Sequence, residues 1–184
     1  MVASYLIMIL PMMAILSLLI YMPIFIWNKR RYGKRPMIRH LAIYVLIGVV
    51  TSILYLTIFI GGFDFTFHPG YHLLNLVPFI WIRQTYIMGA AKMFQQLVLN
   101  IVMFVPLGFI LPIVFVSMRK WWKMILCVIA FILCIEAFQY FIGRAADVDD
   151  LIMNTLGAVI GYGLMKLGEK HFKNRAWWKA ATQG

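Results

Sequence analysis

The sequence predicts an all-α fold, a polytopic helical membrane bundle of about five transmembrane helices with a re-entrant or interfacial segment near residues 71–88. The first observation behind this prediction is composition: 64% of the 184 residues are hydrophobic, 12% are charged, and the mean hydropathy is +0.88. A soluble domain of this length has too little interior to bury so much apolar surface. The second observation is that the apolar residues form runs of about 18 or more, the length at which a helix crosses the roughly 30 Å hydrocarbon layer. Together they exclude a soluble globular protein.

Each predicted span corresponds to one apolar run, and the runs together form a single membrane domain. The five spans cover residues 5–27, 41–60, 97–117, 124–142 and 151–166. The first run has neither a basic lead-in nor a small-residue cleavage site, so we predict a true span and not a signal peptide. The ten residues 73–82 are apolar but too short to cross, and Pro78 interrupts them. They therefore favour a re-entrant or interfacial segment.

The cations are distributed unevenly between the loops. With five spans, the connectors 28–40 and 118–123 and the basic tail lie on one side and hold 14 of the 17 Lys and Arg residues. Because cationic loops resist translocation, this asymmetry predicts a cytoplasmic C-terminus and an external N-terminus in the cell membrane. The net charge of +11 then lies beside anionic headgroups, which makes membrane lipids the expected partner and gives no support to a nucleic acid partner. In the tail, Trp177 and Trp178 among cations are typical of an interfacial anchor.

A polar cluster lies where the fourth predicted helix turns into the fifth. Four of the six acids fall between residues 136 and 150, in a segment whose external turn opens at Gly143. Glu136 lies about seven residues before that turn, roughly 10 Å below the outer surface. A carboxylate at this depth is costly unless it is paired or faces a wet cavity. We therefore predict an outward-facing polar cleft for ligand binding or catalysis, formed by Glu136, Gln139, Arg144, Asp147, Asp150 and Asn154.

Two interpretations of this cluster are open. In one, Arg144 pairs with Asp147 or Glu136, and the set is a closed ion-pair network that only pins one helix to the next. In the other, Arg144 binds a phosphate or carboxylate, while the acids act as acid and base, bind a divalent ion, or accept hydrogen bonds from a ligand. We predict no metal site and no cofactor, since Asp-x-Asp-Asp lacks EF-hand spacing and helix-breaking residues separate His68 from His72.

Helix packing is the expected role of a second group, Asn100, Gly157 and Gly161. The two glycines lie four residues apart on nearly one helix face, where they let another helix approach closely, and a buried Asn supplies a hydrogen bond across such a contact. Asp147 or Asp149 can cap the last span by accepting from its free N–H groups.

Polar residues at fixed offsets within this apolar background resemble the VanZ-like family of bacterial membrane proteins. The resemblance covers about residues 70–165, while the first 70 residues match only in being hydrophobic and Asp149 falls at a position that the pattern leaves open. The matching blocks are Asn75-Leu76-Val77-Pro78-Phe79, Asn100 with Phe104-Val105-Pro106-Leu107-Gly108-Phe109, and Glu136-x-x-Gln139 followed by Arg144-x-x-Asp147-x-x-Asp150-x-x-x-Asn154-x-x-Gly157-x-x-x-Gly161. The resemblance implies antibiotic resistance at the cell envelope, to the glycopeptide teicoplanin and to lipoglycopeptides, by a route that leaves peptidoglycan precursors unchanged.

Three functions are consistent with these features. The leading one is an envelope protein whose cleft binds a lipid-linked envelope precursor, a lipoglycopeptide or a similar drug-like ligand. The alternative is an intramembrane enzyme acting on a lipid phosphate or glycolipid, in which Arg144 neutralises phosphate, Glu136 is the acid and Asp147 or Asp150 is the base. A proton-coupled transporter ranks last, because its polar residues would extend through the membrane depth. No particular oligomeric state is predicted.

Overall fold

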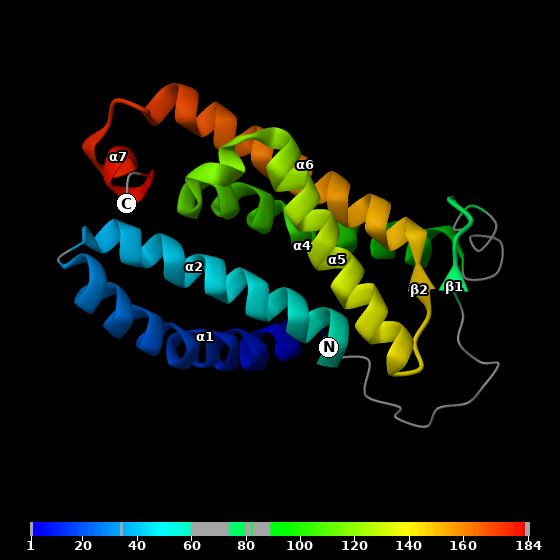
Figure 1. The fold of residues 1–184 in the computed structure, drawn as a ribbon. Coiled ribbons are helices and arrows are strands. Elements are labelled where there is room, and N and C mark those ends of the chain that lie inside the picture. Colours follow the sequence, from blue (N-terminus) through cyan, green and yellow to red (C-terminus); the bar gives the residue numbers. More distant parts are fainter. Residues whose placement is uncertain (1, 34, 60–73, 80–81, 83–88, 183–184) are drawn as a thin grey trace.

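In the part of the chain that the structure describes, five long helices build the molecule (Figure 1). The computed structural model describes residues 2–33, 35–59, 74–79, 82 and 89–182. In chain order the long helices are α1 (Val2–Tyr32), α2 (Met37–Leu54), α4 (Ala90–Val114), α5 (Trp121–Phe141) and α6 (Val148–Phe172). The shorter elements are a π-helical turn η1 (Tyr55–Phe59) that continues α2, a 3-10 turn η2 (Val116–Arg119) and a C-terminal helix α7 (Ala176–Thr182).

Each of the five long helices is long and apolar enough to cross a membrane, which confirms the predicted all-α polytopic bundle. The candidate spans are Pro11–Arg31, Met37–Phe59, Met93–Val114, Trp121–Phe141 and Val148–Phe172. The last span is longer than the predicted 151–166. Its final turns contain Lys166, Glu169 and Lys170, which end the hydropathic run but are good helix formers, so the helix continues where the apolar pattern stops.

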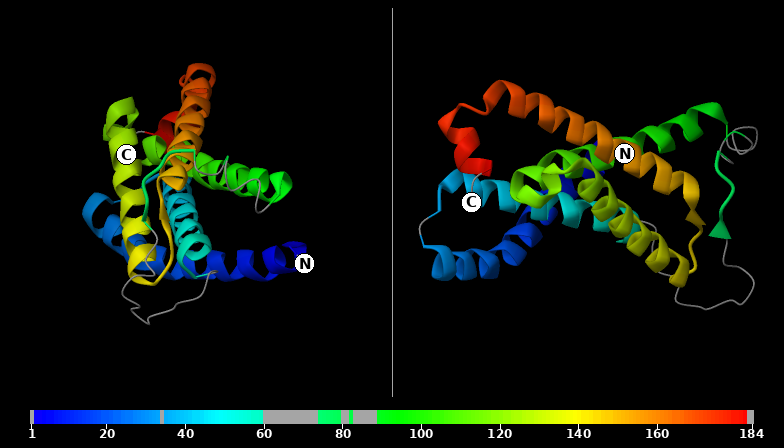
Figure 2. Two further views of the ribbon diagram at one scale, coloured as in Figure 1. Left: turned by 90° about the vertical axis from the view of Figure 1, so that its right-hand side faces the viewer. Right: turned by 45° about the horizontal axis from the view of Figure 1, so that its top comes forward.

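Helices α4 and α6 make the most extensive contact in the bundle, and Figure 2 shows them crossing. Glycines allow the two backbones to touch. A Cβ atom at Gly157 would collide with the carbonyl of Ile101, one at Gly161 with the carbonyl of Val105, and one at Gly108 with the carbonyl of Ala158. The largest fully buried side chains of the described residues include Phe104, Ile132, Met124 and Met165, which belong to one hydrophobic core. The core is therefore centred on α4, with α2, α5 and α6 packed around it.

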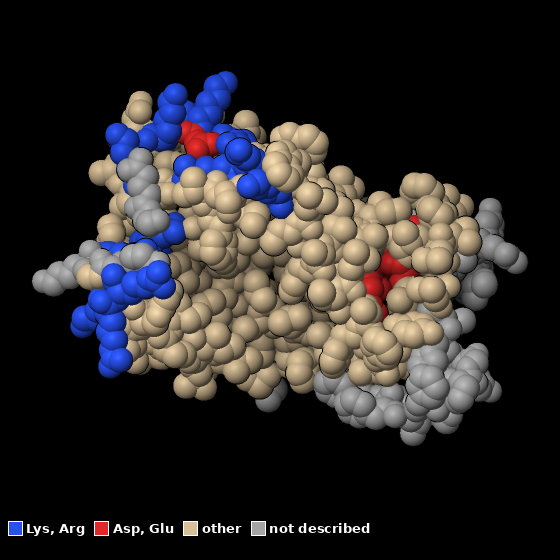
Figure 3. All heavy atoms as spheres, viewed as in Figure 1, with Lys and Arg blue, Asp and Glu red and all other residues tan. Residues whose placement is uncertain are grey.

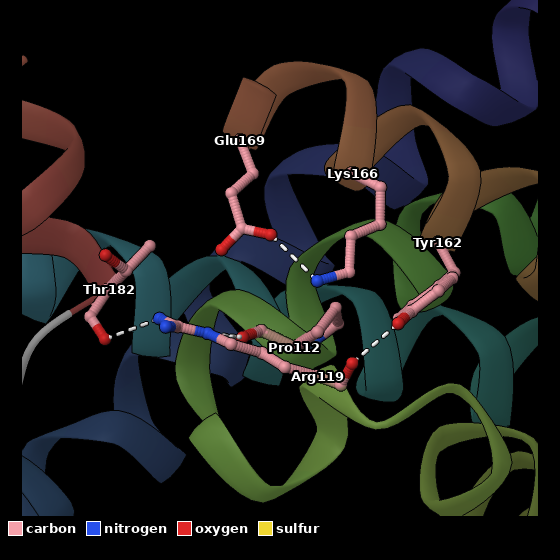
Figure 4. Close-up of polar contacts among 6 residues, drawn as sticks. All are labelled: Pro112, Arg119, Tyr162, Lys166, Glu169 and Thr182. Carbon is pink, nitrogen blue, oxygen red and sulfur yellow. Dashed lines mark hydrogen bonds and ion pairs between the residues drawn. The ribbon is translucent and has the colours of Figure 1, made fainter. Parts of the chain in front are cut away.

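The described cations gather mainly at one end of the bundle, while the described acids other than Glu169 lie toward the other end (Figure 3). Backbone carbonyls fix one of these cations, Arg119, against two helix ends. Its Nη2 donates to the carbonyl of Thr182 over 2.8 Å, and its own carbonyl accepts from the Tyr162 hydroxyl over 2.6 Å (Figure 4). Beside it, Lys166 and Glu169 form an ion pair of 2.8 Å.

The C-terminal helix α7 folds back onto the bundle at this basic end (Figure 1). The interfacial interpretation of its tryptophan pair is wrong for Trp178, which is 5% exposed and packs against Gly168, whereas Trp177 remains exposed. Arg39 of α2 holds α7 in place. Its Nη1 donates to the carbonyls of Ala181 and Ile113.

A short parallel pair of strands lies at the end of the bundle opposite to the basic end. Strand β1 (Leu74–Asn75) pairs with β2 (Ala146–Asp147), with Asn75 opposite Asp147. These strands connect the predicted re-entrant segment to the beginning of α6. Most of that predicted segment, including residues 71–73 and 83–88, lies outside the described residues, as do His68 and His72.

Candidate functional site

A cavity of about 780 Å³ lies between α1, α2, α4, α5 and α6. Five of the six side chains in the predicted polar cluster line it, and Asp147 is the one that does not. Asn100 of α4, assigned on sequence grounds to helix packing, also lines the cavity. The lining residues of the cluster are Glu136, Gln139, Arg144, Asp150 and Asn154.

The cavity has an apolar part and a polar part. The apolar part is supplied by side chains of α1, α2, η1 and α4, such as Met13, Val49, Leu56 and Met103. The polar cluster comes from the end of α5, the turn that follows and the first turns of α6, which places it at the end of the bundle that carries β1 and β2. A mostly apolar cavity with a few convergent polar groups is the usual form of a small-molecule site.

Glu136 ties α5 to the beginning of α6. Its side chain is 8% exposed, and its Oε2 accepts a 3.0 Å hydrogen bond from the backbone N–H of Asp147. Glu136 lies in the next-to-last turn of α5, and the chain reverses at Gly143, whose φ of 81° requires a residue without a side chain. This reversal returns the chain to Glu136 within eleven residues, and it explains why an acid inside an apolar helix finds a donor.

Arg144 and Gln139 both donate to one backbone carbonyl, that of Thr57. Arg144 Nη1 approaches it to 2.5 Å and Gln139 Nε2 to 2.8 Å. Thr57 lies in η1, where the helix that begins as α2 ends and its last carbonyls carry partial negative charge. The ion pair between Arg144 and either Asp147 or Glu136 that one interpretation expected is absent from the described structure. The guanidinium therefore keeps Nε and Nη2 for another acceptor, since no described residue accepts from either atom.

The remaining acid in the cavity, Asp150, bonds across the helix crossing. Its Oδ1 accepts a 2.5 Å hydrogen bond from Asn100 Nδ2 on α4. One turn further along α6 lies Asn154, which is 4% exposed. Its side-chain oxygen is buried without a partner among the described residues, although it belongs to a residue of the cavity wall. A buried amide oxygen without a donor is costly, so Asn154 presents an open acceptor to the site.

Asp147 and Asp149 organise the segment that borders the cavity. Asp147 is the N-cap of α6, where its Oδ1 accepts from the backbone N–H of Asp149 over 2.8 Å and from Asn75 Nδ2 over 2.9 Å. Asp149 Oδ1 accepts from the backbone N–H of Phe79, a residue in the left-handed region with φ 64°. Both acids therefore fix residues 74–79 against the start of α6.

This arrangement can recognise an amphiphile. Two carboxylates and the open amide oxygen accept hydrogen bonds, while Arg144 offers donors and positive charge. Among the residues described by the structure, His, Cys, Asp and Glu nowhere gather in a group of three that could hold a metal ion. The polar groups are thus suited to a ligand with hydroxyl or ammonium donors and an anionic group, joined to an apolar portion.

Two hydrogen-bonding partners in this site were not among the site residues predicted from the sequence. The carbonyl of Thr57 belongs to the backbone, so no side-chain pattern indicates it. Asn75 had a signal, because it is the single polar residue in the apolar run 73–82, and the structure pairs it with Asp147.

Comparisons with known proteins identify the family of the chain. No curated protein and no solved structure shows significant similarity to the chain. The sequence pattern that defines the VanZ/LLP1 family matches residues 41–169. This range contains α4, α5, most of α2 and nearly all of α6, and with them most of the cavity wall. Because this match covers well over half of the chain, the chain belongs to the VanZ/LLP1 family.

Proposed function

We propose that this VanZ/LLP1 membrane protein lowers susceptibility to teicoplanin and related lipoglycopeptides by binding an amphiphilic ligand in the cavity between α1, α2, α4, α5 and α6. The observation that carries the proposal is the cavity's composition. Apolar helix faces line most of it, and Glu136, Arg144 and Asp150 converge at one end. This is a chemical match for a molecule with an acyl chain and a polar group rich in hydrogen-bond donors.

Teicoplanin-type drugs and lipid-linked envelope precursors both have this chemistry. An acyl chain would occupy the apolar part beside Leu56 and Met103. Hydroxyl or ammonium groups would donate to the carboxylates and to Asn154 Oδ1, while an anionic group would accept from the remaining N–H groups of Arg144. Such a ligand would be held at the membrane surface, and fewer drug molecules would reach their target.

The proposed orientation places the cavity's polar end outside the cell. The described cations lie mainly at the opposite end of the bundle (Figure 3), and cationic loops remain in the cytoplasm. Residues 143–150 would then face the outer leaflet, where acylated antibiotics insert.

The proposal is tested by expressing the chain and its variants in a susceptible bacterium and measuring the minimal inhibitory concentration of teicoplanin. We expect Arg144→Gln and Asp150→Asn to lose protection at equal abundance in the membrane, while Arg175→Gln, at the basic end and exposed, retains it. Unchanged protection in both cavity variants would remove the cavity from the mechanism. Vancomycin, which has no acyl chain, serves as the comparison drug, and equal protection against it would contradict a role for the acyl chain.

Binding and turnover are distinguished with purified protein. Saturable binding of a fluorescent teicoplanin without chemical change is the expected result, and Arg144→Gln weakens it. Conversion of a lipid phosphate or glycolipid into a product would contradict the binding proposal and support an intramembrane enzyme.

A further inference from the structure

A second cavity lies at the basic end of the bundle, apart from the polar cluster. It has a volume of about 560 Å³ and is formed by the second half of α1, the connection at Gly33 and the first half of α2. Most of this wall comes from residues before position 41, outside the range matched by the family. Nothing in the proposed function uses it.

The wall of this second cavity is mainly apolar and aromatic. Leu18, Tyr21 and Phe25 contribute from α1, and Leu41 and Tyr44 contribute from α2. Leu18 and Lys29 are eleven residues apart on one helix, which corresponds to roughly 16 Å along its axis. That length is about half of the 30 Å hydrocarbon layer. The cavity therefore has the depth of one membrane leaflet.

Among the described residues, two cations, Lys29 and Arg35, and the imidazole of His40 close the end of the cavity nearest the connection between the helices. The first 63 residues of the chain contain six Lys or Arg and not one Asp or Glu, so this hairpin carries no acid of its own. The described acid at the same end, Glu169, is already paired with Lys166. Positive charge thus accumulates at the mouth of an apolar cavity.

His40 is fixed at the boundary between the apolar wall and the basic end. Its Nδ1 shares a 2.6 Å hydrogen bond with the Tyr21 hydroxyl, and its ring meets the Phe25 ring edge-on at 4.9 Å between centroids. These contacts hold the imidazole between the two helices. Arg35 is also oriented, since its Nη1 donates to Asn28 Oδ1 over 3.5 Å.

From this geometry we infer that the α1–α2 cavity binds an anionic phospholipid from the leaflet beside the basic end. The phosphate lies among Lys29, Arg35 and His40, and one acyl chain extends along Phe25, Tyr21 and Leu18. The charge of the headgroup complements that of the mouth, and the leaflet-deep apolar wall accommodates the chain. A zwitterionic lipid also brings a cationic group to this mouth, so the site selects lipids with net negative charge.

The test measures lipid binding to the purified full-length chain in detergent by native mass spectrometry, with phosphatidylglycerol and phosphatidylcholine of identical acyl chains. We expect phosphatidylglycerol to bind with 1:1 stoichiometry and at least 10-fold tighter than phosphatidylcholine. The double variant K29Q/R35Q removes two charges from the mouth, each worth about 1 kcal/mol, so its affinity falls by roughly 30-fold. The matched control K170Q/K173Q removes two exposed charges at the same end but outside the cavity, and it stays within about 3-fold of the parent.

A third variant tests the apolar wall with all charges intact. Leu41 is 52% exposed, so Leu41→Trp fills the cavity without disturbing the core, and we expect it to lose phosphatidylglycerol binding as well. Glycerol phosphate, the headgroup without acyl chains, is expected not to compete. The inference is overturned if both double variants weaken binding equally, if phosphatidylcholine binds as tightly as phosphatidylglycerol, or if Leu41→Trp binds normally. Thermal unfolding of each variant within a few degrees of the parent shows that the fold is retained.

Discussion

The carboxylate of Glu136 accepts a hydrogen bond of 3.0 Å from the backbone N–H of Asp147, so an acid near the end of α5 holds the residue that caps α6. Asp147 in turn accepts from the N–H of Asp149 and from the side chain of Asn75. One intramembrane carboxylate therefore anchors the cap, the short β pair and the wall of the main cavity. The cluster that defines the site is also part of the fold at this end.

Two replacements of Glu136 distinguish the effect of its charge from the effect of the hydrogen bond that it accepts. Glu136→Gln retains a side-chain oxygen for the Asp147 N–H, whereas Glu136→Leu leaves that partly buried donor without its partner. We expect the Leu variant to have a free energy of unfolding about 1–3 kcal/mol below that of the Gln variant, measured in mixed micelles of mild detergent and SDS. Equal stability of the two variants would show that the hydrogen bond contributes nothing to the fold.

At the crossing of α4 and α6, we predict that a methyl group added to a glycine of α6 lowers the free energy of unfolding only where it meets α4. Gly157→Ala and Gly161→Ala place a Cβ against backbone atoms of α4, which cannot move independently of the helix. We expect each to lower the free energy of unfolding by about 1–3 kcal/mol, as overpacked cores do. Gly163→Ala is the matched control, because its Cβ meets nothing within 4 Å. Comparable destabilisation at Gly163 would attribute the cost to the helix and not to the crossing.

The hydrogen bonds of Arg39 lead to a prediction about how firmly the C-terminal helix α7 is held against the bundle. Its guanidinium donates to three carbonyls, those of Ile113, Val114 and Ala181, and a single ammonium cannot reproduce this planar fork. We expect Arg39→Lys to release α7, so that limited trypsin digestion cleaves after Lys173 or Arg175 several-fold faster than in the parent. Arg30→Lys, at an exposed position on α1, is expected to leave the cleavage rate unchanged. Equal rates for the parent and the Arg39 variant would contradict a role for the fork.

The proposed orientation predicts opposite labelling of two engineered cysteines. Ala145 is exposed in the turn between α5 and α6, and Asn174 is exposed in the turn between α6 and α7. In a background without the two free cysteines, Cys127 and Cys134, we expect a membrane-impermeant maleimide to label Ala145→Cys on intact cells. Asn174→Cys should label only after the membrane is opened. The reverse pattern would invert the topology and place the polar end of the main cavity in the cytoplasm.

Much of the fold could be predicted from the hydropathy of individual segments of the chain. The number of spans could be predicted because each hydropathic run supplies its own backbone hydrogen bonds as a helix and needs no partner to be stable in lipid. The end of α6 was placed too early, because Lys166 and Glu169 lower the hydropathy without breaking the helix. The sequence predicted an interfacial position for Trp178, but this side chain packs against α6. The prediction failed because a Trp among cations gives the same sequence pattern whether its segment lies on lipid or folds back on protein.

The structure brings five of the six residues of the predicted polar cluster to one cavity, but the hydrogen bonds that they form could not be predicted. Glu136, Asp150 and Asn154 could be selected from the sequence because a polar side chain inside an apolar membrane helix costs free energy, so such residues usually have a functional or structural role. The hydrogen-bond partners of these side chains could not be predicted in the same way. One of the two interpretations placed Arg144 beside Asp147 or Glu136, whereas the structure bonds it to the carbonyl of Thr57, 87 residues away. Every residue carries a carbonyl, so nothing in the sequence distinguishes the one that a helix end leaves free.

The sequence by itself determined the membrane class, the five spans, the separation of charge between the two ends, and the polar residues that the bundle must accommodate. All of these depend on summed transfer free energies and on spacing along one helix. Only the tertiary structure decided that Asn100 would bond to Asp150, that Asn154 would face a cavity with an open acceptor, and that α1 and α2 would enclose a second, basic-mouthed cavity. The first two features arise where helices distant in the chain meet, at the close approach of α4 and α6 at their glycines. The third arises from the packing of α2 back against α1.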